Sequence, residues 1–170
     1  MTHILVDTAN TFFRARHVTR GDASEKVGMA IHIMFASIKK AWGDFDGSHV
    51  VFCLEGRSFR KDLYAPYKRN RKEMAEAMTE KEKEENDVFW ECYDDFVDFI
   101  KTKTNVTVLQ NPRVEADDLI ARWIDKHPDQ KHVIISTDKD LNQLITPRVK
   151  QYNGVSEVTM THEGWFERNG

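Results

Sequence analysis

Three short apolar runs in the chain are each followed by carboxylate side chains. If these runs are parallel strands, their carboxyl ends form one edge of a sheet, which is where binding sites form in open α/β folds. Carboxylates crowded at such an edge repel one another, and they partly take up protons unless a cation joins them. The runs and their acids are residues 4–6 with Asp7, residues 50–54 with Glu55, and residues 133–135 with Asp138 and Asp140.

Three more acidic residues lie together at the start of a predicted helix over residues 115–124. Glu115 and Asp118 are three positions apart and so share a face of that helix, with Asp117 next to them. A helix start also favours acids for a local reason, because its dipole stabilises negative charge. Taken alone, this group is therefore either a cap with its first turn or a set of metal ligands.

Each of the other acids, taken alone, also has a purely structural explanation. Asp7 could be a cap residue, and residues 138–140 could form a turn. Their joint placement at strand ends favours a metal site. Hard cations such as Mg²⁺ take oxygen ligands, and no cluster of cysteine and histidine suggests zinc. We therefore expect a site for Mg²⁺ or Mn²⁺, and two such ions can activate water and stabilise the leaving oxygen in phosphodiester cleavage.

Basic side chains gather between residues 57 and 72, although the net charge of the whole chain is −3. Phosphate contacts are local, so a net-acidic protein that binds nucleic acid must collect its basic groups in one place. Tyr64 and Tyr67 can stack on unpaired bases. The alternative is that Phe59, Leu63 and Tyr64 anchor the core and the basic groups are surface charge; we accept it for Phe59 and Leu63. The seven basic residues are Arg57, Arg60, Lys61, Lys68, Arg69, Arg71 and Lys72.

The elements that must position these residues alternate along the chain. Apolar runs predict strands over residues 4–6, 50–54, 106–109 and 133–136, with one or two edge strands in 150–161. Helical spacing predicts helices over residues 27–42 and 115–124, and residues 72–100 are rich in helix-forming sequence. This alternation predicts an α/β fold with a mainly parallel twisted sheet and helices on both faces.

Composition excludes several classes of protein. With 170 residues, 40% hydrophobic and 31% charged, the chain suits one ordinary soluble domain over residues 1–170. No apolar run is long enough to span a membrane or to act as a signal peptide. We interpret Cys53 and Cys92 as buried free thiols in a reducing cytosol, so we expect a cytoplasmic protein without membrane contact.

Four motifs, taken in order, resemble the 5′ nuclease (flap endonuclease) family, which has a PIN-like fold. The resemblance is greatest to bacteriophage 5′-3′ exonucleases and to the 5′-nuclease domain of bacterial DNA polymerase I, and it covers essentially the whole chain. The stretch Tyr67-Lys68-Arg69-Asn70-Arg71 separates this family from the PIN-type ribonucleases. The motifs are Ile-Leu-Val-Asp-Thr-Ala-Asn at residues 4–10, the basic-aromatic stretch at 59–71, Val-Glu-Ala-Asp-Asp at 114–118 and Ser-Thr-Asp-Lys-Asp at 136–140.

The resemblance implies a divalent-metal-dependent 5′-3′ exonuclease or flap endonuclease of replication and repair, with two ions in the complete enzyme. Its substrates would be DNA with a 5′ flap or 5′ end and RNA primers on DNA, and Lys68, Arg71 and Asp138 would be catalytic. An insertion at about residues 57–90 would form a helical arch. The seven basic residues named above, together with Tyr64 and Tyr67, would contact the nucleic acid. We expect a monomer with a polymerase or single-strand-binding protein as partner, in the host cytoplasm if a bacteriophage encodes it. The implied metal ligands are Asp7, Glu55, Glu115, Asp117, Asp118, Asp138 and Asp140.

Two features depart from the family pattern. Position 55 is Glu where the family has Asp, which keeps an oxygen donor but lengthens the side chain. The sequence stops at Gly170, before the Gly-Asp-x-x-Asp-Asn motif and the helix–hairpin–helix-like DNA-binding module of the family. We therefore expect that the chain is either a fragment or a member of a lineage that has lost the module. In both cases we expect weakened nuclease activity. The alternatives are a PIN-type endoribonuclease and a catalytically impaired nucleic-acid-binding fragment.

Overall fold

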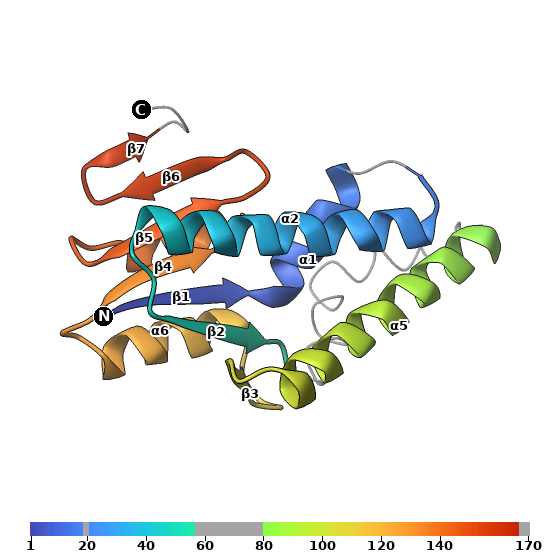
Figure 1. Cartoon of the computed structure of the whole chain (residues 1–170), viewed down its shortest axis with the longest axis horizontal. Helices are drawn as coiled ribbons and strands as arrows, with labels where there is room; N and C mark the ends of the chain where they lie inside the picture. The colour runs from blue at the N-terminus through green and yellow to red at the C-terminus, as the bar shows by residue number, and fades with distance from the viewer. Residues whose placement is uncertain (19–20, 57–79, 167–170) are drawn as a thin grey trace.

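The computed structural model describes residues 1–18, 21–56 and 80–166 (Figure 1). Within these ranges the strands form one seven-stranded sheet in the order β3-β2-β1-β4-β5-β6-β7. The first five strands in this order are parallel, and the last two pairings are antiparallel. The mainly parallel sheet predicted from the sequence is thus confirmed. The strands are β1 Thr2–Asp7, β2 His49–Leu54, β3 Thr107–Gln110, β4 Lys131–Ile135, β5 Val149–Asn153, β6 Val158–Thr161 and β7 Gly164–Phe166.

Strand β1, the middle one of the five parallel strands, is buried along its whole length. Successive side chains of a strand point to opposite faces, so a strand covered on both faces is apolar throughout. Ile4 and Val6 enter one hydrophobic cluster, whereas Leu5 enters a second cluster on the other face. The sheet therefore separates two cores, and helices must cover both of its faces.

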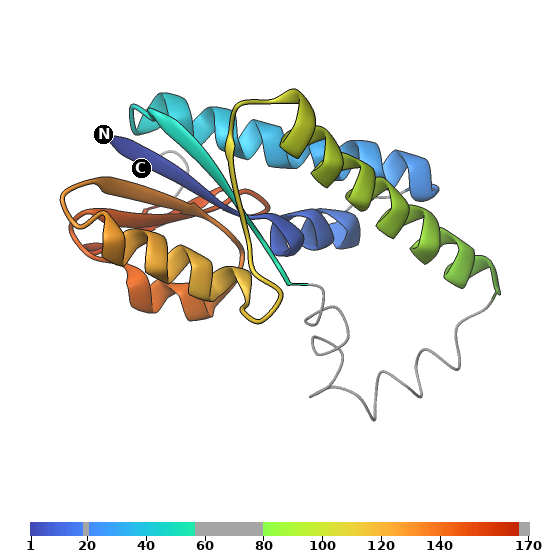
Figure 2. The ribbon, with the colours of Figure 1, turned by 90° about the horizontal axis from the view of Figure 1, so that it is seen from below.

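In the part of the chain that the structure describes, three helices cover the first face: α1 (Thr8–Val18), α2 (Ala23–Asp44) and α5 (Glu80–Lys103). Figure 2 shows α2 and α5 on one side of the sheet and α6 on the other. Phe12 is fully buried here, with its ring 4.8 Å from that of Phe89. Of the predicted arch insertion, residues 57–79 lie outside the described residues, and residues 80–90 form the first part of α5.

The second face is covered by α6 (Ala116–Lys126), which packs through Ile120. Toward its C-terminal end, the Trp123 Nε1–H donates to His3 Nδ1 over 2.9 Å. The helix is thus attached to β1 by a polar contact as well as by apolar packing. After β4, the chain enters a short 3₁₀ helix, η1 (Lys139–Leu144).

The structure also contains elements that the sequence did not predict. Helix α1 directly follows β1, and its adjacent Phe12 and Phe13 obscure the helical spacing of apolar residues. The last strand, β7, and the helix η1 were likewise not predicted. Cys53 and Cys92 are both free, but only Cys53 is buried, so the interpretation of both thiols as buried was wrong for Cys92. No helix in the described ranges is long and apolar enough to cross a lipid bilayer.

Candidate metal centre

Three carboxylates converge at the carboxyl edge of the sheet. Asp7 is the last residue of β1, Glu55 follows β2, and Asp117 lies in the first turn of α6. One carboxylate oxygen from each lies within 4.8 Å of the other two. We call Asp7, Glu55 and Asp117 the carboxylate cluster. Its position follows from the fold, because β1 and β2 are parallel neighbours and Asp7 lies opposite Cys53.

Asp7 is the most deeply buried member of the cluster, with 1% of the residue exposed. Its Oδ2 accepts a hydrogen bond from the Ser136 hydroxyl over 2.9 Å, while its Oδ1 is buried without a hydrogen-bond partner among the described residues. Burial, followed by the charge of Asp117, raises the pKa of Asp7 well above its ordinary value. A buried carboxylate oxygen without a partner is costly, and a bound cation would remove that cost.

Glu55 reaches the N-terminus of α6. Its Oε2 accepts from the backbone N–H of Ala116 over 3.2 Å. Burial outweighs this bond and raises the pKa of Glu55 to about 7. The backbone is held as well, because Gln110 Nε2 donates to the Glu55 carbonyl. The next residue, Gly56, packs so closely against the Asn111 carbonyl oxygen that a Cβ there would lie 2.4 Å from it. The longer side chain at position 55 is thus anchored at both ends.

Asp117 completes the carboxylate cluster. Burial and the charge of Asp138 raise its pKa to about 6. Glu115 is the N-cap residue of α6, but its side chain makes no capping hydrogen bond. Burial and the charge of Asp118 also raise the pKa of Glu115. The acids at this helix start therefore form a negatively charged region around Asp117 rather than a hydrogen-bonded cap.

The turn between β4 and η1, residues 136–138, carries the next carboxylate. Asp138 caps η1, since its Oδ1 accepts from the backbone N–H of Asp140 over 2.9 Å. Asn10 of α1 holds the turn, because its Oδ1 accepts from both the backbone N–H and the hydroxyl of Thr137 at 2.9 Å each. Ser136 Oγ also accepts from the backbone N–H of Asp138. This network joins the turn to the Asp7 end of β1.

The donor set suits a hard divalent cation. The cluster offers carboxylate oxygens only, which Mg²⁺ and Mn²⁺ prefer, whereas zinc sites usually include nitrogen or sulfur. Burial first, and then the charges of neighbouring carboxylates, raise the pKa values of Asp7, Glu55 and Asp117, so their ionised forms are unfavourable without a cation. An ion bound between them would stabilise the ionised forms. The residues present therefore fit a divalent metal.

The predicted site residues fall into three groups. Asp7, Glu55 and Asp117 lie together in the cluster. The other four predicted ligands are outside this set of mutually close oxygens, and their role as ligands stays a prediction: Glu115, Asp118, Asp138 and Asp140. The predicted nucleic-acid and phosphate contacts lie outside the described residues: Arg57, Arg60, Lys61, Tyr64, Tyr67, Lys68, Arg69, Arg71 and Lys72.

Neutral polar residues that hold the acids were not among the residues predicted to function. Asn10 and Ser136 both fall inside motifs that we quoted, but only the carboxylates of those motifs were given a function. One signal was available, because Asn10 lies three positions after Asp7, immediately beyond a strand end. Its partner Thr137 is distant in sequence, so the contact itself could not be read from spacing.

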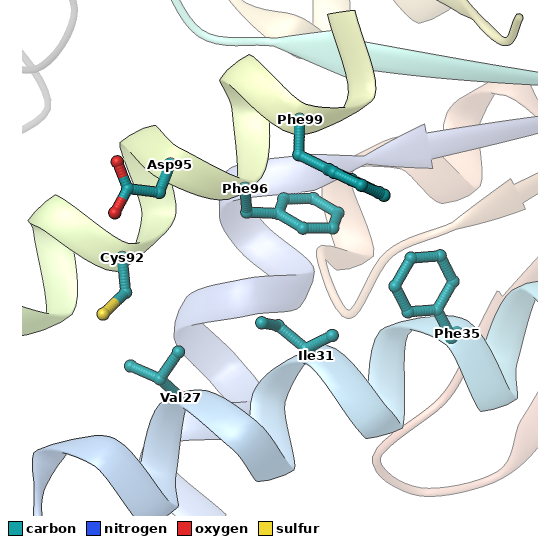
Figure 3. A pocket seen from close by; sticks show the side chains of 7 residues that line it. All are labelled: Val27, Ile31, Phe35, Cys92, Asp95, Phe96 and Phe99. Atoms are coloured by element: carbon teal, nitrogen blue, oxygen red, sulfur yellow. The ribbon is translucent and has the colours of Figure 1, made fainter. Parts of the chain in front are cut away.

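A second concave surface lies away from the carboxylate cluster, between α2 and α5. Figure 3 shows it lined mainly by apolar side chains from these two helices. It contains a single acidic side chain, so its lining does not resemble a metal centre. Its residues are Val27, Ile31, Phe35, Cys92, Asp95, Phe96 and Phe99.

Comparison with known proteins identifies the relatives of this chain. A family model described as the 5′-3′ exonuclease N-terminal resolvase-like domain matches residues 2–170. Flap endonuclease Xni of Aeromonas hydrophila is 31% identical over 157 residues, which cover 87% of this chain and 54% of that protein. The 5′-3′ exonuclease of Buchnera aphidicola is 25% identical, over 94% of this chain and 51% of that protein. The chain thus spans about half the length of the curated relatives it matches.

Solved structures share the fold. The bacteriophage T5 5′-exonuclease, in a structure with bound divalent zinc ions, superposes with a TM-score of 0.70 at 24% identity, over 95% of this chain and 58% of that one. At this level of identity the likeness establishes the fold and leaves the chemistry to be argued from the residues. The PIN-like α/β fold expected from the sequence is confirmed.

Proposed function

The chain belongs to the family of the 5′-3′ exonuclease N-terminal resolvase-like domain, and from this premise we propose that it forms the metal-binding part of a 5′ nuclease. The reaction would be hydrolysis of phosphodiester bonds at 5′ flaps or 5′ ends of DNA, including RNA primers on DNA. The observation that carries the proposal is the carboxylate cluster at the carboxyl edge of the sheet. DNA as substrate agrees with a bacteriophage T5 flap endonuclease of the same fold, which was solved in complex with DNA and metal ions.

The chain's own residues would divide the work as follows. The carboxylate cluster would hold Mg²⁺ or Mn²⁺, and the charges of Asp138 in the β4–η1 turn and Asp140 in η1 act on Asp117 of the cluster. A divalent ion there supplies Lewis acidity toward the phosphodiester and toward water. Ser136 and Asn10 keep the turn against Asp7, so the two sets of carboxylates stay close. We propose Lys68 and Arg71 as contacts of the scissile phosphate, because cations there offset charge that develops in the transition state.

Cleavage of labelled nucleic acid tests the proposal. A DNA substrate with a labelled 5′ flap and an RNA of the same sequence would be incubated with the protein and Mg²⁺ or Mn²⁺. We expect flap cleavage that is lost in Asp117→Asn and kept in Asp125→Asn, since both residues lie on α6 but Asp125 is exposed and outside the cluster.

Metal binding is measured on the same proteins by titration calorimetry. Asp117→Asn should weaken Mn²⁺ binding at least about tenfold, whereas Asp125→Asn should leave it unchanged. Cleavage of RNA alone would favour a PIN-type endoribonuclease instead. If the unsubstituted protein bound no Mn²⁺, the assignment of the cluster as a metal centre would be wrong.

A further inference from the structure

A buried amide lies behind the carboxylate-bearing turn. Gln151 is in the middle of β5 and is 5% exposed. Its Nε2 donates to two backbone carbonyls of the β4–η1 turn, that of Ser136 over 3.2 Å and that of Asp138 over 2.8 Å. One side chain thus spans the turn from its first residue to its last.

An apolar residue would be expected at this position. Val149, two residues earlier and so on the same face of β5, belongs to the hydrophobic cluster under α6. A buried polar side chain costs free energy unless its hydrogen bonds compensate, and the Oε1 of Gln151 has no partner among the described residues. The sheet alone gives no reason for an amide here, whereas the two donated bonds to the turn do.

The turn is therefore held from two sides. Asn10 fixes it from α1 through Thr137, and Gln151 fixes it from β5 through the carbonyls of Ser136 and Asp138. The held turn keeps Asp138 near Asp7, because Ser136 Oγ accepts from the Asp138 N–H and donates to Asp7 Oδ2. Without the Gln151 amide, two carbonyls lose a donor, and the backbone bond from the Ser136 N–H to the Tyr152 carbonyl remains as the attachment of the turn's first residue to β5.

We propose that Gln151 is a positioning residue of the metal centre, whose amide fixes the β4–η1 turn so that Asp138 and Asp140 stay beside the carboxylate cluster. This inference rests on the proposed function. Gln151 touches no reacting group in this role; it acts through the backbone of the turn. Residues that orient metal ligands from behind typically change metal affinity about 10–100-fold when they are replaced.

The test measures Mn²⁺ binding, with Mn²⁺ alone as the probe. Gln151→Met keeps the length of the side chain and removes both polar atoms, and Gln151→Glu replaces the donor by an oxygen that faces two carbonyls. The matched control is Gln143→Met, since Gln143 is exposed on η1. Titration calorimetry gives the affinity, and the electron paramagnetic resonance spectrum of Mn²⁺ reports the symmetry of its ligands. Thermal unfolding in chelator shows whether each variant is folded at the temperature of the titration.

We expect both Gln151 variants to be folded, to bind Mn²⁺ at least about tenfold more weakly and to give an altered Mn²⁺ spectrum, while Gln143→Met matches the unsubstituted protein. A purely structural role would lower the melting temperature but leave the affinity and spectrum of the folded variant unchanged, and that result overturns the inference. If Gln151→Met does not fold, the comparison is made with Gln151→Glu. Should Asp117→Asn weaken binding while both Gln151 variants do not, only the positioning role fails. Should the unsubstituted protein bind no Mn²⁺, both proposals fail.

Discussion

Replacing Glu55 by Gln separates the electrostatic cost of the carboxylate cluster from its proposed function in metal binding. In the folded protein, burial raises the pKa of Glu55 from 4.5 to about 7. A displacement of this size corresponds to about 3 kcal/mol of preference for the neutral carboxyl. Because Glu55 is only half-buried, solvent screening reduces the effect to about 2 kcal/mol. Gln can still accept the hydrogen bond from the Ala116 N–H, so the substitution changes mainly the charge.

The sign follows from proton linkage. A raised folded-state pKa means that the folded protein binds the proton more tightly than the unfolded chain, so the contribution of Glu55 to stability is present below about pH 4.5 and is lost as pH rises to about 7. Above that range, the free energy of unfolding of the metal-free Glu55→Gln protein should exceed that of the metal-free unsubstituted protein by about 2 kcal/mol. Its affinity for Mn²⁺ should fall at least about tenfold, because one oxygen ligand has lost its charge.

Urea unfolding in chelator across this pH range, together with Mn²⁺ titration, measures both effects. Glu163→Gln is the control, since Glu163 is exposed between β6 and β7. If the free energy of unfolding of Glu55→Gln depended on pH in the same way as that of the unsubstituted protein, the Glu55 carboxylate would not lie in a buried anionic cluster. If stability rose but Mn²⁺ affinity did not change, the electrostatic argument would stand and the assignment of Glu55 as a ligand would be refuted.

Three further substitutions concern Gly56 beside the carboxylate cluster, Gly28 of α2, and His3, which accepts a hydrogen bond from Trp123 of α6. Gly56→Ala should destabilise the fold by about 1–3 kcal/mol, because its Cβ would lie 2.4 Å from the Asn111 carbonyl oxygen, whereas Gly28→Ala meets nothing within 4 Å and should stabilise α2 by roughly 0.5–1 kcal/mol. Urea unfolding measures both, and equal effects would contradict the close approach at Gly56. Burial, then the charge of His132, lowers the pKa of His3 from 6.5 to about 4, so the stability that neutral His3 supplies is complete above pH 6.5 and is lost as pH falls to about 4. His3→Asn should remove this acid-sensitive part of the unfolding profile, and an unchanged profile would show that another group causes it.

The sheet could be predicted because its central strands are continuous apolar runs. Strand β4 (Lys131–Ile135) has four buried residues in succession, a pattern that parallel strands covered on both faces require. Helix α1 could not be predicted in the same way. Its Phe12 packs against Phe89 of α5, and this contact between distant parts of the chain leaves no simple spacing in the local sequence.

The site was predictable to the extent that it depends on strand ends. Asp7 and Glu55 follow apolar strands, and both are in the carboxylate cluster. At the start of α6 the spacing of Glu115 and Asp118 drew attention to a shared helix face, yet Asp117 is the residue that joins the cluster. Which of these acids meets Asp7 and Glu55 depends on how α6 is rotated against the sheet. The packing of Ile120 on the sheet contributes to that rotation.

By itself the sequence determined the type of donor atom at the candidate site, since it supplies carboxylate oxygens at strand ends and no cysteine–histidine set. Only the tertiary structure decided which donors meet. The parallel register of β1 and β2 sets Asp7 beside the chain that carries Glu55, and the Ala116–Glu55 hydrogen bond, between residues 61 positions apart, brings α6 and Asp117 to the same edge. Side-chain identity is local, but a distance within 4.8 Å between carboxylates of three elements depends on how the whole chain packs.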